Sequence, residues 1–150
     1  MKIPLVDLKA QYKAIKKEID KVIFGVIKSS KFVLGENLEK FEQEFAKFCK
    51  VKYAIGVGNG TDAIYLILRA FGIGKGDEII IPANTFIATA EPLRLVGAEP
   101  SFIDIDPETY NIDVNKLEKT ITKKTKAIIP VHLYGQSADM APILKIDKKH

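Results

Sequence analysis

The sequence predicts an α/β protein in which a mostly parallel sheet is covered by helices on both faces. Four short apolar runs, each of the length of a buried strand, alternate with segments whose apolar residues have helical spacing. Glycines, prolines and polar turn residues separate the two kinds of segment. Because parallel strands need crossover connections, this alternation indicates consecutive βαβ units. A chain of 150 residues is long enough to bury a sizeable core.

Residues 1–35 are predicted to form an N-terminal arm and a helix, ahead of an α/β domain at residues 36–150. The arm is expected to be extended over residues 1–9. From about Ala10, apolar residues at helical spacing face away from lysines, which is typical of an amphipathic helix. After a break at Ser29, the apolar loop at residues 32–35 is expected to pack on the core or to contact another subunit.

A second helix is predicted at residues 36–50. Its apolar residues Leu38, Phe41, Phe45 and Phe48 recur at helical spacing. A stripe of this kind normally lies in a core, so we assign it no chemistry.

The stretch GVGNGTDA at residues 56–63 follows a predicted buried strand at residues 53–57 and precedes a helix from about Ala63 to Phe71. Free backbone N–H groups and the positive end of the helix dipole would meet there and stabilise an anion. The Thr61 hydroxyl would either cap the helix or bind the anion. A tight turn with a capping threonine explains the same residues without a ligand.

The rest of the chain predicts three further strands and three further helices. Pro92 should kink or shorten the helix expected at about residues 84–96, because proline lacks the backbone N–H group. The carboxylates Asp104 and Asp106 lie where a strand runs into a turn, and turn formation is a sufficient explanation for both. The strands are expected at residues 78–81, 101–105 and 126–131, and the helices at about 84–96, 113–122 and 139–150.

Three loops with polar or aromatic residues are expected to leave the carboxyl ends of the strands, at residues 58–61, 84–86 and 132–136. Ligands of parallel sheets bind outside those ends. A phosphate-binding turn, a flat aromatic ring and a His/Tyr pair would together suit a phosphorylated aromatic ligand.

Composition and charge exclude several classes of function. The net charge is +4, but the basic residues alternate with acidic ones and do not cluster as in a nucleic-acid interface. No apolar run reaches the length of roughly 20 residues that spans a bilayer, and no signal peptide is recognisable. The single Cys49 permits no internal disulfide and fits a reducing compartment. We therefore expect a cytoplasmic protein that binds neither nucleic acid nor membrane.

The chain contains five segments that together form a recognisable pattern: PLVDL at residues 4–8, FVLG at 32–35, GNGTDA at 58–63, GDEIIIPANTF at 76–86 and PVHLYGQ at 130–136. Together these segments resemble the sugar-nucleotide aminotransferases of the DegT/DnrJ/EryC1/StrS family. The resemblance covers essentially the whole chain, in order and with matching spacing. It implies the aspartate aminotransferase fold and the cofactor pyridoxal 5'-phosphate (PLP).

By this resemblance, Asn59, Gly60 and Thr61 hold the cofactor phosphate and Phe86 lies against the face of the pyridine ring. The alternative for Phe86 is a core aromatic beneath its loop. Tyr134 is a candidate substrate contact. The family's Schiff-base lysine and its pyridine-pairing aspartate fall after residue 150, so we predict no catalytic residue, and no metal site, in this chain.

The implied activity is transamination of a ketosugar attached to a nucleoside diphosphate, with glutamate as amino donor, in a homodimer. The chain would be the N-terminal part of a longer protein and inactive by itself. Two alternatives stay open: a PLP-dependent nucleotide-sugar dehydratase of the same family, and a non-catalytic module that binds a nucleotide or a protein partner.

Overall fold

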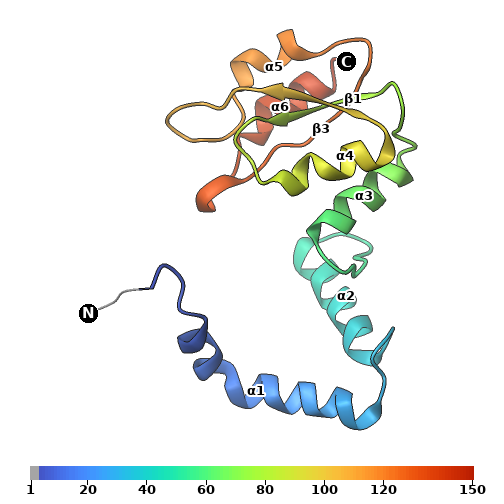
Figure 1. Cartoon of the computed structure of the whole chain (residues 1–150), viewed down its shortest axis with the longest axis vertical. Helices are drawn as coiled ribbons and strands as arrows, with labels where there is room; N and C mark the ends of the chain where they lie inside the picture. The colour runs from blue at the N-terminus through green and yellow to red at the C-terminus, as the bar shows by residue number, and fades with distance from the viewer. Residues whose placement is uncertain (1–3) are drawn as a thin grey trace. The chain divides into compact units, whose positions relative to one another are not determined.

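The computed structural model describes residues 4–150, so the first three residues of the predicted arm lie outside the described residues. The described chain forms two compact units, one ending at Gly56 and the other covering Val57–His150 (Figure 1). The domain boundary expected near residue 35 stays a prediction.

The first unit contains two helices joined by a short loop. Helix α1 covers Leu8–Ser29, and its N-terminus is capped by Asp7, whose carboxylate accepts a hydrogen bond from the Ala10 amide at 2.9 Å. Helix α2 covers Glu36–Cys49. The break predicted at residues 29–31 is confirmed, since the α1 helix ends there with Ser30 in the left-handed conformation.

The apolar faces of these two helices are not buried by the described chain. No residue of α1 is buried, and in α2 only Ala46 is. The core position predicted for Phe41, Phe45 and Phe48 is therefore wrong for the described residues, in which these rings are exposed and contact one another. Two helices and a loop provide no second layer that could cover both apolar faces.

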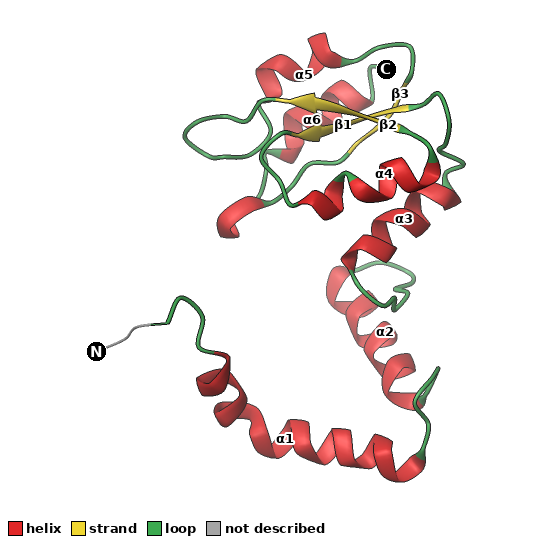
Figure 2. Cartoon of the chain, in the orientation of Figure 1, coloured by secondary structure: helices red, strands yellow, loops and turns green. Residues whose placement is uncertain are grey.

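The second unit is built around a three-stranded parallel sheet in the order β2-β1-β3 (Figure 2). The strands are β1 (Glu78–Pro82), β2 (Glu99–Ile103) and β3 (Thr125–Ile128). All three isoleucines of the central strand β1 are fully buried. This confirms the predicted parallel α/β architecture.

Helices cover both faces of the sheet. On one face Ile79 and Ile81 pack in a cluster that includes Leu68 of α3 (Gly60–Ala70) and Leu93 of α4 (Glu91–Val96). On the other face Ile80 packs with residues of α5 (Val114–Thr120) and α6 (Met140–Asp147). Because side chains alternate along a strand, one run of three isoleucines supplies both clusters.

The predicted strand at residues 53–57 is not formed. The side chains of Tyr53, Ile55 and Val57 are exposed, that of Ile55 by 81%, and no segment within residues 4–150 pairs with this run. The Gly56 amide instead donates to the Glu42 carboxylate at 2.7 Å. An apolar run becomes a strand only where a neighbouring strand accepts its backbone hydrogen bonds.

Pro92 shortens the helix predicted at residues 84–96, as expected. The segment is divided into a 3-10 turn, η1 (Ile87–Thr89), and helix α4, in which Pro92 lies in the first turn. A second 3-10 turn, η2 (Leu133–Gly135), follows β3. The strand predicted at residues 101–105 begins two residues earlier, at Glu99.

Gly97 ends helix α4 with a φ of 87°, where a side chain is strained. We expect Gly97→Ala to lower the free energy of unfolding of the full-length protein by about 1–2 kcal/mol, measured by urea unfolding. The control is Gly74→Ala, where an added Cβ meets only ordinary contacts and φ is not positive. An equal loss at both positions would contradict the conformational explanation.

Candidate functional site

The first turn of α3 is fixed by Asn59. The Asn59 side chain accepts a hydrogen bond from the Asp62 amide at 2.9 Å and donates one to the Asp62 carboxylate at 3.0 Å. Asn59 is therefore the helix cap, and the alternative in which Thr61 caps the helix is wrong. Both residue types can cap a helix, but the helix begins at Gly60, three residues before the predicted start.

The same turn leaves donors for a ligand. Helix geometry gives the amides of Gly60 and Thr61 no intrahelical acceptor, and none of residues 4–150 accepts a hydrogen bond from them or from the Thr61 hydroxyl. Apart from its chain neighbours and the adjacent backbone of its own helix, no atom of the described residues lies within 4 Å of the place that a Cβ on Gly60 would take. Two amides, a hydroxyl and open space beside a helix N-terminus fit a phosphate group.

Asp62 limits what else this turn can tolerate. Its carboxylate lies 2.9 Å from the place that a Cβ on Gly58 would take, so a side chain at that position would displace it. The hydrogen bond from the Asn59 side chain partly offsets the negative charge of this carboxylate.

Phe86 lies in the loop that leaves the carboxyl end of β1, and its side chain is 76% exposed. A core position beneath the loop is therefore wrong for the described chain. The loop is tied by Thr85 and Thr89, whose hydroxyls lie 2.9 Å apart. Helix α3 contacts η1, the turn that Phe86 caps, so the helix that begins at Gly60 and the aromatic ring lie on neighbouring elements.

The loop after β3 carries His132 and Tyr134, which differ in environment. The Nδ1 atom of His132 accepts a hydrogen bond from the Ala138 amide at 3.0 Å, so this ring holds the loop together. Tyr134 is exposed, and its ring contacts the ring of Tyr110. The structure thus separates a structural histidine from a tyrosine that is available to a ligand.

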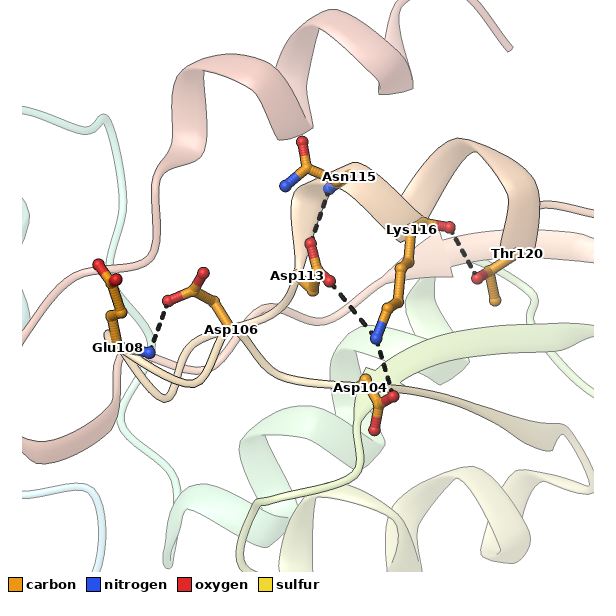
Figure 3. A network of polar contacts seen from close by, with 7 residues as sticks. All are labelled: Asp104, Asp106, Glu108, Asp113, Asn115, Lys116 and Thr120. Atoms are coloured by element: carbon orange, nitrogen blue, oxygen red, sulfur yellow. Dashed lines mark hydrogen bonds and ion pairs between the residues drawn. The ribbon is translucent and has the colours of Figure 1, made fainter.

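Asp106 forms a turn, as predicted. Its carboxylate accepts hydrogen bonds from the Thr109 amide at 2.8 Å, the Thr109 hydroxyl at 3.0 Å and the Glu108 amide at 3.0 Å. These bonds, with Thr109 contributing most, hold the pKa of Asp106 below its usual value. Figure 3 shows the carboxylate beside the Glu108 amide.

Asp104 is engaged in an ion pair. The Lys116 ammonium group lies 2.9 Å from the Asp104 carboxylate and 3.5 Å from that of Asp113, as Figure 3 shows. The hydrogen bond to Asp104 raises the pKa of Lys116. Asp113 also caps α5, where it accepts from the Asn115 amide at 3.0 Å. Asp104 and Asp113, through Lys116, therefore link the end of β2 to the start of α5.

Two residues of this region, Tyr110 and Asn111, were not found from the sequence. Asn111 is buried, and its side chain bonds to the backbone at Leu133 and Gln136. No local pattern marks Asn111, because its partners lie more than 20 residues away in the chain.

Within the described residues, no cluster of histidine, cysteine, aspartate or glutamate could hold a metal ion. None of the helices in residues 4–150 combines the length and the apolar character that a membrane span requires.

The family model for the DegT/DnrJ/EryC1/StrS aminotransferase family matches residues 13–150. The chain belongs to this family. A pleiotropic regulatory protein of Geobacillus stearothermophilus is 51% identical over 150 residues, which make up 100% of this chain and 40% of that protein. A dTDP-3-amino-3,6-dideoxy-alpha-D-galactopyranose transaminase of Aneurinibacillus thermoaerophilus is 47% identical over 148 residues, or 99% of this chain and 41% of that protein.

Solved structures of family members have the same fold. The crystal structure of S. venezuelae DesV in complex with a ketimine intermediate has a TM-score of 0.95 at 41% identity and covers 99% of this chain and 40% of that one. A GDP-4-keto-6-deoxymannose-3-dehydratase with a trapped PLP-glutamate geminal diamine has a TM-score of 0.80 at 38% identity, covering 87% of this chain and 35% of that one. The chain thus spans about 40% of the length of the relatives it matches.

Proposed function

We propose that the full-length protein is a PLP-dependent aminotransferase that acts on a nucleotide-linked ketosugar, with glutamate as amino donor. The first turn of α3 carries this proposal, because its two free amides and the Thr61 hydroxyl fit a phosphate group. The names of the similar transaminase and of the PLP-glutamate structure support both the activity and the donor. When bound, PLP supplies an electron sink for the bonds that transamination breaks.

In this proposal the described residues bind and orient. Gly60 and Thr61 hold the cofactor phosphate, Asn59 keeps their turn in place, and Phe86 stacks on the pyridine ring. Tyr134 contacts the substrate. Residues 36–150 form the N-terminal part of the cofactor-binding domain, behind an arm and helix at residues 1–35.

The test uses the full-length protein mixed with PLP, followed by glutamate and a panel of ketosugar nucleotides. We expect the absorption band of bound PLP, release of 2-oxoglutarate and an aminated sugar nucleotide. A protein that binds no PLP, or that releases no 2-oxoglutarate with any member of the panel, would contradict the proposal.

A nucleotide-sugar dehydratase is the second candidate, because one similar structure is a dehydratase. The same experiment separates the two activities. If the product formed with PLP and glutamate has lost water and contains no new nitrogen, the protein is a dehydratase and not an aminotransferase.

A non-catalytic binding module is the third candidate, since the regulatory protein of Geobacillus stearothermophilus is a close relative. In that case calorimetry would detect binding of a nucleotide or a protein partner, while neither 2-oxoglutarate nor a dehydrated sugar would form.

A cytoplasmic homodimer is the proposed assembly. The loop residues Phe32, Val33 and Leu34 are exposed, as is the apolar face of α1, and both are candidates for the interface. A sedimentation experiment on the full-length protein tests this, and an active monomer would contradict it. The cytoplasmic location is supported by the single Cys49.

Phe86→Ala is expected to weaken PLP binding by about 2- to 12-fold, because aromatic stacking contributes about 0.5–1.5 kcal/mol beyond the buried area. A titration of the full-length protein with PLP measures the change. Phe86→Tyr keeps the ring and serves as the control. Equal affinities for the alanine variant and the wild type would exclude the stacking role.

A further inference from the structure

Two tyrosines from different loops contact each other in the second unit. Tyr110 follows β2 and Tyr134 lies in η2, after β3. Their ring centroids are 5.8 Å apart and the ring planes meet at 72°, so the rings pack edge to face. Both loops leave carboxyl ends of strands that flank β1, and the loop with Phe86 leaves the carboxyl end of β1 itself. Ligands of parallel sheets bind at this edge.

Both tyrosines adopt a backbone conformation that favours glycine. The φ angles are 59° at Tyr110 and 54° at Tyr134. A residue with a Cβ atom is strained there, whereas the neighbouring Gly135, at 82°, is not. A tyrosine is favoured over glycine at such a position only if its ring makes an interaction that offsets the backbone strain.

Burial of the two rings within the described chain does not offset this strain. Tyr134 is 78% exposed and Tyr110 47% exposed. The rings therefore combine backbone strain with a large free surface, and strained residues of this kind are concentrated at ligand sites.

Asn111 fixes the position of the two rings. It is only 4% exposed and follows Tyr110 directly. Its side-chain oxygen accepts a hydrogen bond from the Leu133 amide at 3.2 Å, and its side-chain nitrogen donates to the Gln136 carbonyl at 3.4 Å. Leu133 and Gln136 lie on either side of Tyr134 in the sequence, so these two bonds fix the loop after β3 against the loop after β2.

We propose that the rings of Tyr110 and Tyr134 form the contact surface for the sugar of the nucleotide-linked substrate, and that Asn111 is the positioning residue that holds this surface. The inference rests on the proposed function. An edge-to-face pair presents a ring face together with phenol hydroxyls. This combination fits a pyranose, which has apolar C–H faces and hydroxyl groups at its rim.

The contact of the Tyr134 ring with the sugar is tested with Tyr134→Ala and Tyr134→Gly in the full-length holoenzyme. We expect both variants to raise KM for the nucleotide sugar by about tenfold, with kcat and PLP affinity within about twofold of the wild type. The glycine variant should have the higher Tm of the two, because glycine relieves the strain at φ 54°. An unchanged KM in both variants would overturn the proposal.

Calorimetry separates the sugar from the nucleotide without turnover. The probes are the aminated sugar nucleotide and the corresponding nucleoside diphosphate. Tyr134→Ala should weaken binding of the sugar nucleotide by about tenfold and leave binding of the nucleoside diphosphate unchanged. An equal loss for both probes would overturn the assignment to the sugar, because the ring would then contact the nucleotide.

The positioning role is tested with Asn111→Ala, alone and combined with Tyr134→Ala. If Asn111 acts through the ring, the single variant raises KM and the double variant shows no further rise beyond Tyr134→Ala. Additive effects on KM would overturn the role. Should Asn111→Ala fail to fold, Asn111→Asp keeps the acceptor for the Leu133 amide and places a carboxylate oxygen against the Gln136 carbonyl. The same comparison then applies to Asn111→Asp, and Asn115→Ala, an exposed asparagine nearby, is the control.

The two proposals fail in different ways. A wild-type protein that binds no PLP and forms no aminated sugar refutes the proposed function. A wild-type protein that is active, with a KM that none of these variants changes, refutes only the role of the tyrosine pair.

Discussion

Thr61→Val in the full-length protein is expected to weaken PLP binding by about 10- to 100-fold. The substitution keeps the shape of the side chain and removes the hydroxyl, which has no partner among residues 4–150 and is free for a phosphate. A hydrogen bond to a charged group contributes about 1.5–3 kcal/mol, and 1.4 kcal/mol corresponds to tenfold in affinity. A titration that follows the absorption of bound PLP measures the change.

Thr61→Ser is the matched control for this substitution, because serine keeps the hydroxyl and loses only a methyl group. Its PLP affinity should stay within about threefold of the wild type. If the valine and serine variants bound PLP equally well, the Thr61 hydroxyl would not contact the phosphate. The Tm of each variant without PLP shows whether the fold itself has changed.

Ile80→Ala is expected to lower the free energy of unfolding by about 2–5 kcal/mol. Ile80 lies in the middle of β1, the central strand, and is fully buried between the sheet and helices α5 and α6. Removing its side chain leaves a cavity in a cluster that the surrounding helices cannot fill by moving closer. Urea unfolding of the full-length protein gives the change in free energy.

The control for this loss of stability is Leu95→Ala, at an exposed aliphatic residue of α4. We expect it to change the free energy of unfolding by about 0.5 kcal/mol or less. Equal losses for Ile80→Ala and Leu95→Ala would contradict the placement of the core. A changed slope of the denaturant dependence would indicate that the unfolded state, rather than the core, has been altered.

Local patterns predicted a strand correctly where another strand of the chain pairs with it. The run of isoleucines in β1 is confirmed because both faces of a central parallel strand require apolar side chains. The run at residues 53–57 is also apolar, but no segment of the described chain pairs with it. Periodicity reports which residues prefer to be buried, and it does not report whether a partner is present. The exposed phenylalanines of α2 have the same cause.

The candidate site was predictable only where its parts are close together in the sequence. The glycines and Thr61 stand next to the start of a helix, so local chemistry indicated an anion site, although the capping residue proved to be Asn59. Asn111 and Tyr110 depend on hydrogen bonds and a ring contact to residues far along the chain. Only the folded arrangement of the loops brings these groups together.

The cap at Asn59 has a consequence for how a cofactor would be taken up. The turn is closed by hydrogen bonds that the protein makes with itself, between Asn59 and Asp62 and from the Ala63 amide to the Asn59 carbonyl at 3.1 Å. Under the proposed function, a phosphate that binds there would meet donors that these hydrogen bonds orient, so little conformational entropy would be lost on binding.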